Sequence, residues 1–178
     1  MTEYEIIKGC IRQDIKCQRM LFEQLAGKML TVCLRYANDN MEAEDMLQDG
    51  FIRVFNNLHQ FKFEGSFEGW VRRVIVNCAL KHLQKKRIIF NEITENTNDT
   101  PRLESYAYAN MGEDELLKLI SQLPDGYRMV FNLNVIEGYS HEEIGNLLNI
   151  QASTSRSQLV KARKMLQYQI LQMQKIAV

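Results

Sequence analysis

Apolar residues recur at intervals of three and four along most of this chain, and that spacing is the strongest constraint on its fold. The pattern runs through residues 20–36, 42–58 and 67–83. Because a helix places every third and fourth residue on one face, each stretch predicts an amphipathic helix. The chain has only two prolines and nine glycines in 178 residues, so few positions interrupt these helices. We therefore expect an all-α fold.

A polar stretch divides the helical pattern into two parts. Residues 91–112 are rich in Asn, Thr and Glu, contain Pro101 and show no sustained apolar period. This composition is typical of a flexible linker. The length of the chain suffices for two small units. We expect two helical domains, residues 1–90 and 113–178, joined by a linker over residues 91–112.

Charge is segregated along the chain, although the formal net charge is zero. Five acids and no base lie between Asp39 and Asp49. Six bases and no acid lie between Trp70 and Arg87, and five bases and no acid follow Glu143. One run of like charge is usually only a solvated helix face. Three segregated runs indicate one acidic and two basic surfaces, and basic surfaces attract phosphate.

Residues 140–164 have the pattern of a helix-turn-helix. Ser140 followed three residues later by Glu143 predicts a capping box at the start of a short helix. Asn149 lies where the turn needs a left-handed backbone, which asparagine tolerates. Gly145 is expected where the two helix axes cross closely. A longer helix should follow over residues 152–175.

The outer face of this last helix fits the major groove of DNA. At 100° per residue, Leu159, Ala162, Leu166 and Ile170 share the inner face. The opposite side is small and polar and then basic, which allows close approach to base edges and phosphates. Its members are Ser153, Ser157, Val160, Lys161 and Lys164, with Thr154 and Arg156 at the flanks.

Several functional classes are disfavoured by patterns that the sequence lacks. No apolar run approaches the roughly 20 residues that span a bilayer, and the acidic start is unlike a secretory signal. We therefore expect a cytoplasmic protein without membrane insertion. Four scattered cysteines form no C-x-x-C pair and three histidines lack ligand spacing, so we expect buried thiols, no metal and no cofactor. They are Cys10, Cys17, Cys33 and Cys78, and His59, His82 and His141.

A helical carboxylate enzyme is also disfavoured. Glu42, Glu44, Asp45 and Asp49 superficially suggest a metal site. The E-x-x-H pairs of di-iron bundles are missing, however, and the stretch lacks the alternating ligands and central glycine of a calcium loop. We expect no catalytic residues.

Three stretches together resemble the extracytoplasmic-function class of bacterial RNA polymerase sigma factors. They are AEDMLQDGFIRVFNNLHQF (43–61), GSFEGWVRRVIVNCALKHLQKKR (65–87) and LPDGYRMVFNLNVIEGYSHEEIGNLLNIQASTSRSQLVKARKML (123–166). They are similar to the family's acidic helix, its Phe-x-x-Trp helix with a basic end, and its promoter-reading domain. The resemblance covers residues 21–171. It implies a sigma region 2 domain over residues 1–90 and a sigma region 4 domain over residues 113–178.

The resemblance implies a non-enzymatic factor that binds core RNA polymerase and directs initiation at promoter −10 and −35 elements. The family's acidic helix binds a coiled coil of the β′ subunit, and the matching residues here are Asp45, Gln48, Asp49 and Arg53. The β flap, promoter DNA and often an anti-sigma factor are further partners of the family. The linker resembles the family connector that threads the polymerase cleft.

The DNA-reading residues of the family also have counterparts in this sequence. For melting and reading the −10 element they are Phe61, Phe63, Phe67, Arg72, Arg73, Asn77 and Lys81, with Lys85, Lys86 and Arg87 on phosphates. For the −35 element, Arg156, Ser157 and Val160 would face bases. Thr154, Lys161, Arg163 and Lys164 would lie near phosphates, and Ser153 belongs to the same recognition helix.

The residues themselves leave two questions open. A stand-alone helix-turn-helix DNA-binding regulator would use only the C-terminal domain, would bind duplex DNA tightly without polymerase and would not need the acidic helix. Asn77 has two interpretations, a contact to a flipped base or a hydrogen bond within the fold. Phe51, Phe55 and Trp70 are expected in the core rather than on bases.

Overall fold

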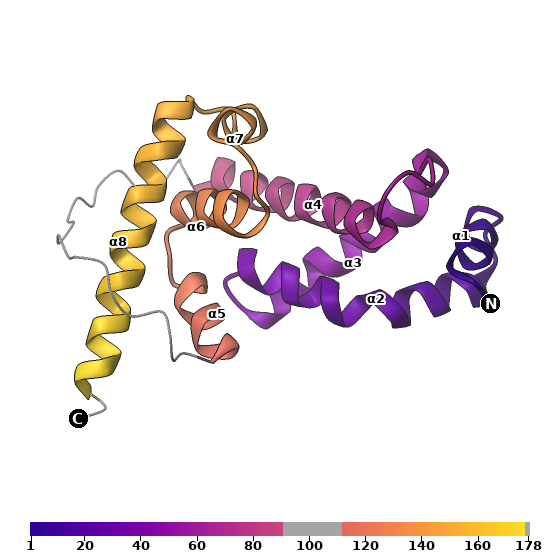
Figure 1. Ribbon diagram of the computed structural model, residues 1–178, viewed down its shortest axis with the longest axis horizontal. Coiled ribbons are helices and arrows are strands. Elements are labelled where there is room, and N and C mark those ends of the chain that lie inside the picture. The colour runs from indigo at the N-terminus through magenta and orange to yellow at the C-terminus, as the bar shows by residue number, and fades with distance from the viewer. Residues whose placement is uncertain (91–111, 177–178) are drawn as a thin grey trace. The chain divides into compact units, whose positions relative to one another are not determined.

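The computed structural model describes the backbone of residues 1–90 and 112–176 (Figure 1). The side chains of residues 86–90, 113 and 174–176 lie outside this description, as does the expected linker except for Gly112. All elements assigned in the described ranges are helices, which confirms the predicted all-α class. They form two compact units, residues 1–86 and 87–178, each considered by itself below. None of the described helices is both long and apolar enough to cross a membrane.

The N-terminal unit is built from α1 (Glu3–Ile11), α2 (Ile15–Tyr36), α3 (Asn40–Asn57), the short 3-10 helix η1 (Leu58–Gln60) and α4 (Phe67–Phe90). Apolar side chains from all four α-helices are buried in its core, among them Ile7, Met29, Met46 and Ile75. Gly50 allows α3 to approach α4, because a Cβ at this position would overlap the Ile75 side chain.

Side-chain caps explain where these helices begin. Asp14 and Asp39 cap α2 and α3, and the Ser66 hydroxyl accepts a hydrogen bond from the Gly69 amide at 3.2 Å at the start of α4. Each cap satisfies an amide that the helix itself leaves without a partner. Thr2 and Glu5 form a capping box for α1. Apolar periodicity did not predict this first helix, although the Thr-x-x-Glu pattern signals it.

The C-terminal unit is built around one long helix. Its elements are α5 (Glu113–Ser121), α6 (Asp125–Phe131), the π-helical turn η2 (Asn132–Ile136), α7 (His141–Leu148) and α8 (Ala152–Ile176). Helices α5, α6 and α7 all pack on α8 (Figure 1). Leu159, Ala162, Leu166 and Ile170 are buried there, as the helical angle predicted.

A buried arginine ties α5 to α6. The Arg128 side chain is fully buried, and its Nη1 donates to the Ser121 carbonyl at 2.7 Å while Nη2 lies 2.6 Å from Asp125 Oδ1. A buried charge is tolerated only when it is paired and hydrogen-bonded, and both conditions are met. Arg128 therefore belongs to the fold rather than to an outer basic surface.

The four cysteines are free thiols and all are buried. Burial raises the pKa of Cys10 to about 11 and that of Cys33 to about 12. Both thiols are therefore protonated at neutral pH and unreactive as nucleophiles. In the described part of the chain, no three His, Cys, Asp or Glu side chains gather as a metal site requires.

Candidate functional site

The acidic run divides into residues that hold α3 and residues that face solvent. The Asp39 carboxylate caps the helix, and buried Glu42 accepts a hydrogen bond from the Asn38 amide at 2.6 Å. Oε1 of Glu42 also lies 3.7 Å from Nε2 of His82 in α4. Three further acids of the run are exposed on α3, together with Gln48. They are Glu44, Asp45 and Asp49.

The exposed face of α3 is both acidic and apolar. Met41 and Ile52 are 75% and 57% exposed on this helix. Arg53 is half-buried, and its positive charge acts on the Cys78 thiol of α4. Burial raises the pKa of that thiol, and the Arg53 charge offsets part of this rise. The four residues expected to bind polymerase thus lie on one helix, with Arg53 at its edge against α4. This face suits a basic partner that also offers apolar side chains.

A polar stripe follows α4. Arg73, Asn77, Lys81 and Lys85 stand four residues apart, and all are exposed. Such a series lies on one side of a helix over about 18 Å. Arg72 is half-buried beside the stripe, and the side chains of Lys86 and Arg87 lie outside the described residues. The exposure of Asn77 favours an external partner over a cross-link within the fold.

Aromatic residues around the loop before α4 pack as one cluster. Phe61 and Phe67 are buried, with ring centroids 5.1 Å apart, and half-buried Trp70 lies 5.7 Å from Phe61. Phe63 is 40% exposed. The phenylalanines expected at the −10 site therefore divide into two that support the loop and one that reaches solvent. Phe51 is buried as expected, and Phe55 is half-buried.

The turn between α7 and α8 has the predicted local structure. Ser140 and Glu143 form the capping box, and Asn149 has the left-handed values φ 54° and ψ 49°. Glycine is required at position 145 for a different reason than the close crossing of helix axes that was expected. A Cβ there would lie 2.7 Å from the Ile150 carbonyl oxygen, so the backbone of the turn itself excludes a side chain. A hydrogen bond of 2.9 Å between His141 Nδ1 and Ser155 Oγ also joins α7 to α8.

The N-terminal half of α8 presents the expected outer face. Thr154 and Lys164 are half-buried, whereas the other members are exposed. The exposed residues are Ser153, Arg156, Ser157, Val160, Lys161 and Arg163. The Ser157 hydroxyl donates to the Thr154 carbonyl at 2.9 Å, so its proton is used within the helix while its oxygen can still accept. This part of α8 offers small polar groups, one apolar side chain and cations.

Glu142 is a residue of this surface that sequence reasoning missed. Its Oε1 lies 3.3 Å from Nη1 of Arg156, and both side chains are largely exposed. The backbone amide of Glu142 and then the Arg156 guanidinium hold the pKa of Glu142 below its ordinary value. The sequence contained no signal for this pair, because the two residues are fourteen positions apart on different helices.

Comparison with known families assigns most of the chain. Residues 21–88 match the model of sigma-70 region 2, and residues 113–166 match that of sigma-70 region 4. The acidic face of α3, the α4 stripe and the aromatic loop lie in the first match. The α7–α8 pair lies in the second.

Individual relatives agree with this assignment. The ECF RNA polymerase sigma factor SigE of Mycolicibacterium smegmatis is 31% identical over 152 residues, which cover 82% of this chain and 58% of SigE. The ECF sigma factor SigW of Bacillus subtilis is 29% identical over 181 residues, covering 93% of this chain and 97% of SigW. The sigma factor RpoE of Bartonella quintana, solved with the anti-sigma factor NepR, has the same fold. Its TM-score is 0.53 at 16% identity, covering 89% of this chain and 98% of RpoE.

Proposed function

The chain belongs to the extracytoplasmic-function sigma factors of bacterial RNA polymerase, and we propose that it performs their role through three separate surfaces. The acidic face of α3 binds the β′ coiled coil of core polymerase through Asp45, Gln48, Asp49 and Arg53. The α4 stripe and the loop before it read and open the −10 element. The outer face of α8 reads the −35 element, and the β flap of polymerase contacts the same domain. The domain boundaries are proposed at residues 90 and 113, with the linker between them.

The single observation that carries this proposal is the presence of regions 2 and 4, in that order, on one chain. A factor that must hold polymerase and read two separated DNA elements requires both. A stand-alone regulator would use only the C-terminal helix-turn-helix and would leave the exposed acids of α3 and the α4 stripe without a function. That alternative is therefore not favoured.

The proposed chemistry uses no catalytic residue of the chain. On the −10 element, an exposed Asn77 can donate to and accept from the edge of a flipped base. Lys81 and Lys85, with Lys86 and Arg87 beyond them, hold the strand through its phosphates. On the −35 duplex, Arg156, Ser157 and Val160 face base edges, and Lys161, Arg163 and Lys164 contact phosphates.

The family also indicates the compartment and the further partners to propose for this protein. We propose that it acts in the cytoplasm, where polymerase and promoter DNA would be its partners. We also propose an anti-sigma factor as a further partner, of the kind bound to RpoE of Bartonella quintana.

A run-off transcription assay tests the proposed function. Core polymerase free of other sigma factors is mixed with this protein and a fragmented genomic library from its source. Discrete transcripts that share two spaced upstream elements are expected, and they would also identify the promoter. The absence of transcripts, together with tight duplex binding by the protein alone, would favour the stand-alone regulator instead.

A further inference from the structure

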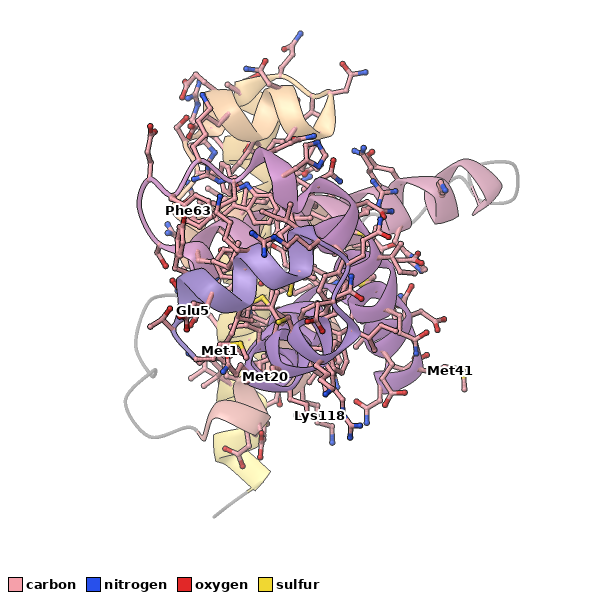
Figure 2. The ribbon with its side chains drawn as sticks, turned by 90° about the vertical axis from the view of Figure 1, so that its right-hand side faces the viewer. Met1, Glu5, Met20, Met41, Phe63 and Lys118 are labelled. Carbon is pink, nitrogen blue, oxygen red and sulfur yellow. The ribbon has the colours of Figure 1, made fainter. Side chains whose placement is uncertain are left out.

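An exposed aromatic pair joins α1 to the loop before α4. Tyr4 is 56% exposed and Phe63 is 40% exposed, and their ring centroids lie 5.0 Å apart with the planes inclined at 51°. The Lys8 ammonium lies 5.4 Å from the centre of the Tyr4 ring and 5.3 Å from that of Phe63. Figure 2 shows Phe63 at the edge of the N-terminal unit, on the same side as Glu5 of α1. Two rings and one cation thus meet at one solvent-exposed point.

The α1 side of this pair is held firmly by the fold. The inner face of α1 is buried, with Ile6, Ile7 and Cys10 only 2%, 1% and 3% exposed. The Thr2–Glu5 capping box fixes the start of this helix. Tyr4 and Lys8 are four residues apart, so their side chains leave the same side of the helix. The ring and the cation are therefore in place before any ligand binds, which reduces the entropy cost of binding.

The Phe63 side is held in an unusual backbone conformation. Phe63 has φ 60°, a left-handed value that a bulky residue rarely adopts. Its ring continues inward to Phe61, at a centroid distance of 5.1 Å. Backbone strain of this kind persists only where the surrounding structure enforces it, often at binding sites. Here the strained residue presents its ring to solvent instead of adding it to the core.

We propose that Tyr4 and Lys8 extend the −10-reading surface, with a base of the separated non-template strand stacking on the Tyr4–Phe63 pair and its phosphate held by Lys8. This inference rests on the proposed function. Aromatic faces beside a cation are the usual means of binding single strands, because every base has a face that can stack. Glu5, the acid next to Tyr4, accepts a hydrogen bond from the Thr2 amide at 2.8 Å and is thereby drawn toward the helix start. Tyr4 and Lys8 lie outside residues 21–88, so the match to region 2 does not assign them a role.

The test measures the affinity of the holoenzyme for the labelled non-template strand of the promoter found by run-off transcription. Tyr4→Leu removes the ring and keeps apolar bulk, and Lys8→Gln removes the charge. The matched controls are Tyr168→Leu, at a tyrosine 38% exposed on α8, and Lys16→Gln, at an exposed lysine of α2. We expect both test variants to bind the strand about five- to tenfold more weakly. Both controls should stay within about twofold of the wild type, a margin below the loss of one stacked base.

Two further measurements separate the possible outcomes. Tyr4→Phe keeps the ring and should retain wild-type affinity, which distinguishes lost stacking from a damaged fold. Unchanged strand affinity in Tyr4→Leu and Lys8→Gln would overturn this inference alone. If Tyr4→Leu and Lys8→Gln weaken binding to core polymerase, and the holoenzyme that still forms binds the strand with wild-type affinity, the pair belongs to the polymerase interface and this inference is overturned. A wild-type holoenzyme that binds no promoter strand would overturn the proposed function and this inference together.

Discussion

At the scale of single residues, Arg156 forms an ion pair with Glu142 within the protein. This ion pair must break before the Arg156 guanidinium can contact DNA. The Arg156–Glu142 pair, at 3.3 Å, is exposed, and exposed ion pairs contribute little stabilising free energy. Replacing Glu142 by DNA as the partner of Arg156 therefore costs little free energy. The carboxylate nevertheless adds a negative charge beside the proposed path of the phosphates. We expect Glu142→Gln to tighten holoenzyme binding to a −35 duplex about two- to fivefold, measured by fluorescence anisotropy. Glu115→Gln, at an exposed acid of α5, is the control. Weaker binding by Glu142→Gln would mean that the pair orients Arg156 productively.

Replacing Arg156 should show whether its guanidinium contacts a base or a phosphate. If its guanidinium makes a bidentate contact to a base, Arg156→Ala should cost about 1–3 kcal/mol on the cognate −35 element and little on unrelated duplexes. The measurement compares holoenzyme affinity for the cognate fragment and for fragments with single base changes. An equal loss on every sequence would make Arg156 a phosphate contact.

Gly145 is the residue on which the turn between α7 and α8 depends. A Cβ would lie 2.7 Å from the Ile150 carbonyl oxygen, which belongs to the backbone and cannot move aside cheaply. We expect Gly145→Ala to destabilise this unit by about 1–3 kcal/mol. Amide hydrogen exchange in α7 and the first turns of α8 would report the loss. Gly27→Ala is the matched control, because no atom beyond its chain neighbours and the backbone of its own helix lies within 4 Å of its Cβ position. Alanine also favours a helix over glycine by about 0.5–1 kcal/mol.

At the scale of helices, the sequence predicted the elements in which periodicity and a cap agree. Helix α4 contains the predicted stretch 67–83 and is capped by Ser66, and α7 follows the Ser140–Glu143 box, as expected. Helix α1 is only nine residues long, too short for its apolar spacing to be distinctive, so its cap was the only usable signal. The π-helical turn η2 has no such signal. The Tyr4–Phe63 contact could not be predicted, because tertiary packing alone brings together residues so distant in the chain.

The exposed face of α3 should be required for binding to core polymerase. Asp45 and Asp49 are exposed, whereas Asp39 and Glu42 hold the start of the helix. Reversing Asp45 and Asp49 to lysine should therefore abolish binding to core polymerase while the helix and the promoter-reading domain remain folded. Co-purification with core polymerase and circular dichroism measure the two effects. Glu23→Lys, an exposed charge reversal on α2, should leave polymerase binding intact. Unchanged binding by the double variant would remove polymerase docking as the role of this face.

At the scale of the whole molecule, charge segregation explains why a protein with no net charge can act on DNA. Each basic surface offers only a few cations, and the exposed acids of α3 belong to the same chain. Affinity for a polyanion rises steeply with the number of phosphates neutralised, so neither surface alone should bind strongly. Polymerase would occupy the acidic face and present both DNA-reading surfaces to one promoter, which multiplies their separate affinities.

The free chain should therefore be a weak DNA-binding protein. At about 0.15 M salt we expect its Kd for promoter duplex to be in the micromolar range or weaker, which is typical of non-specific binding. The holoenzyme should bind the same fragment at least about a hundredfold more tightly, since specific recognition commonly exceeds non-specific binding by that margin or more. Anisotropy titrations of one labelled fragment with free chain, core polymerase and holoenzyme measure the difference. Tight binding by the free chain would contradict the dependence on polymerase, because the C-terminal unit would then suffice to find its site.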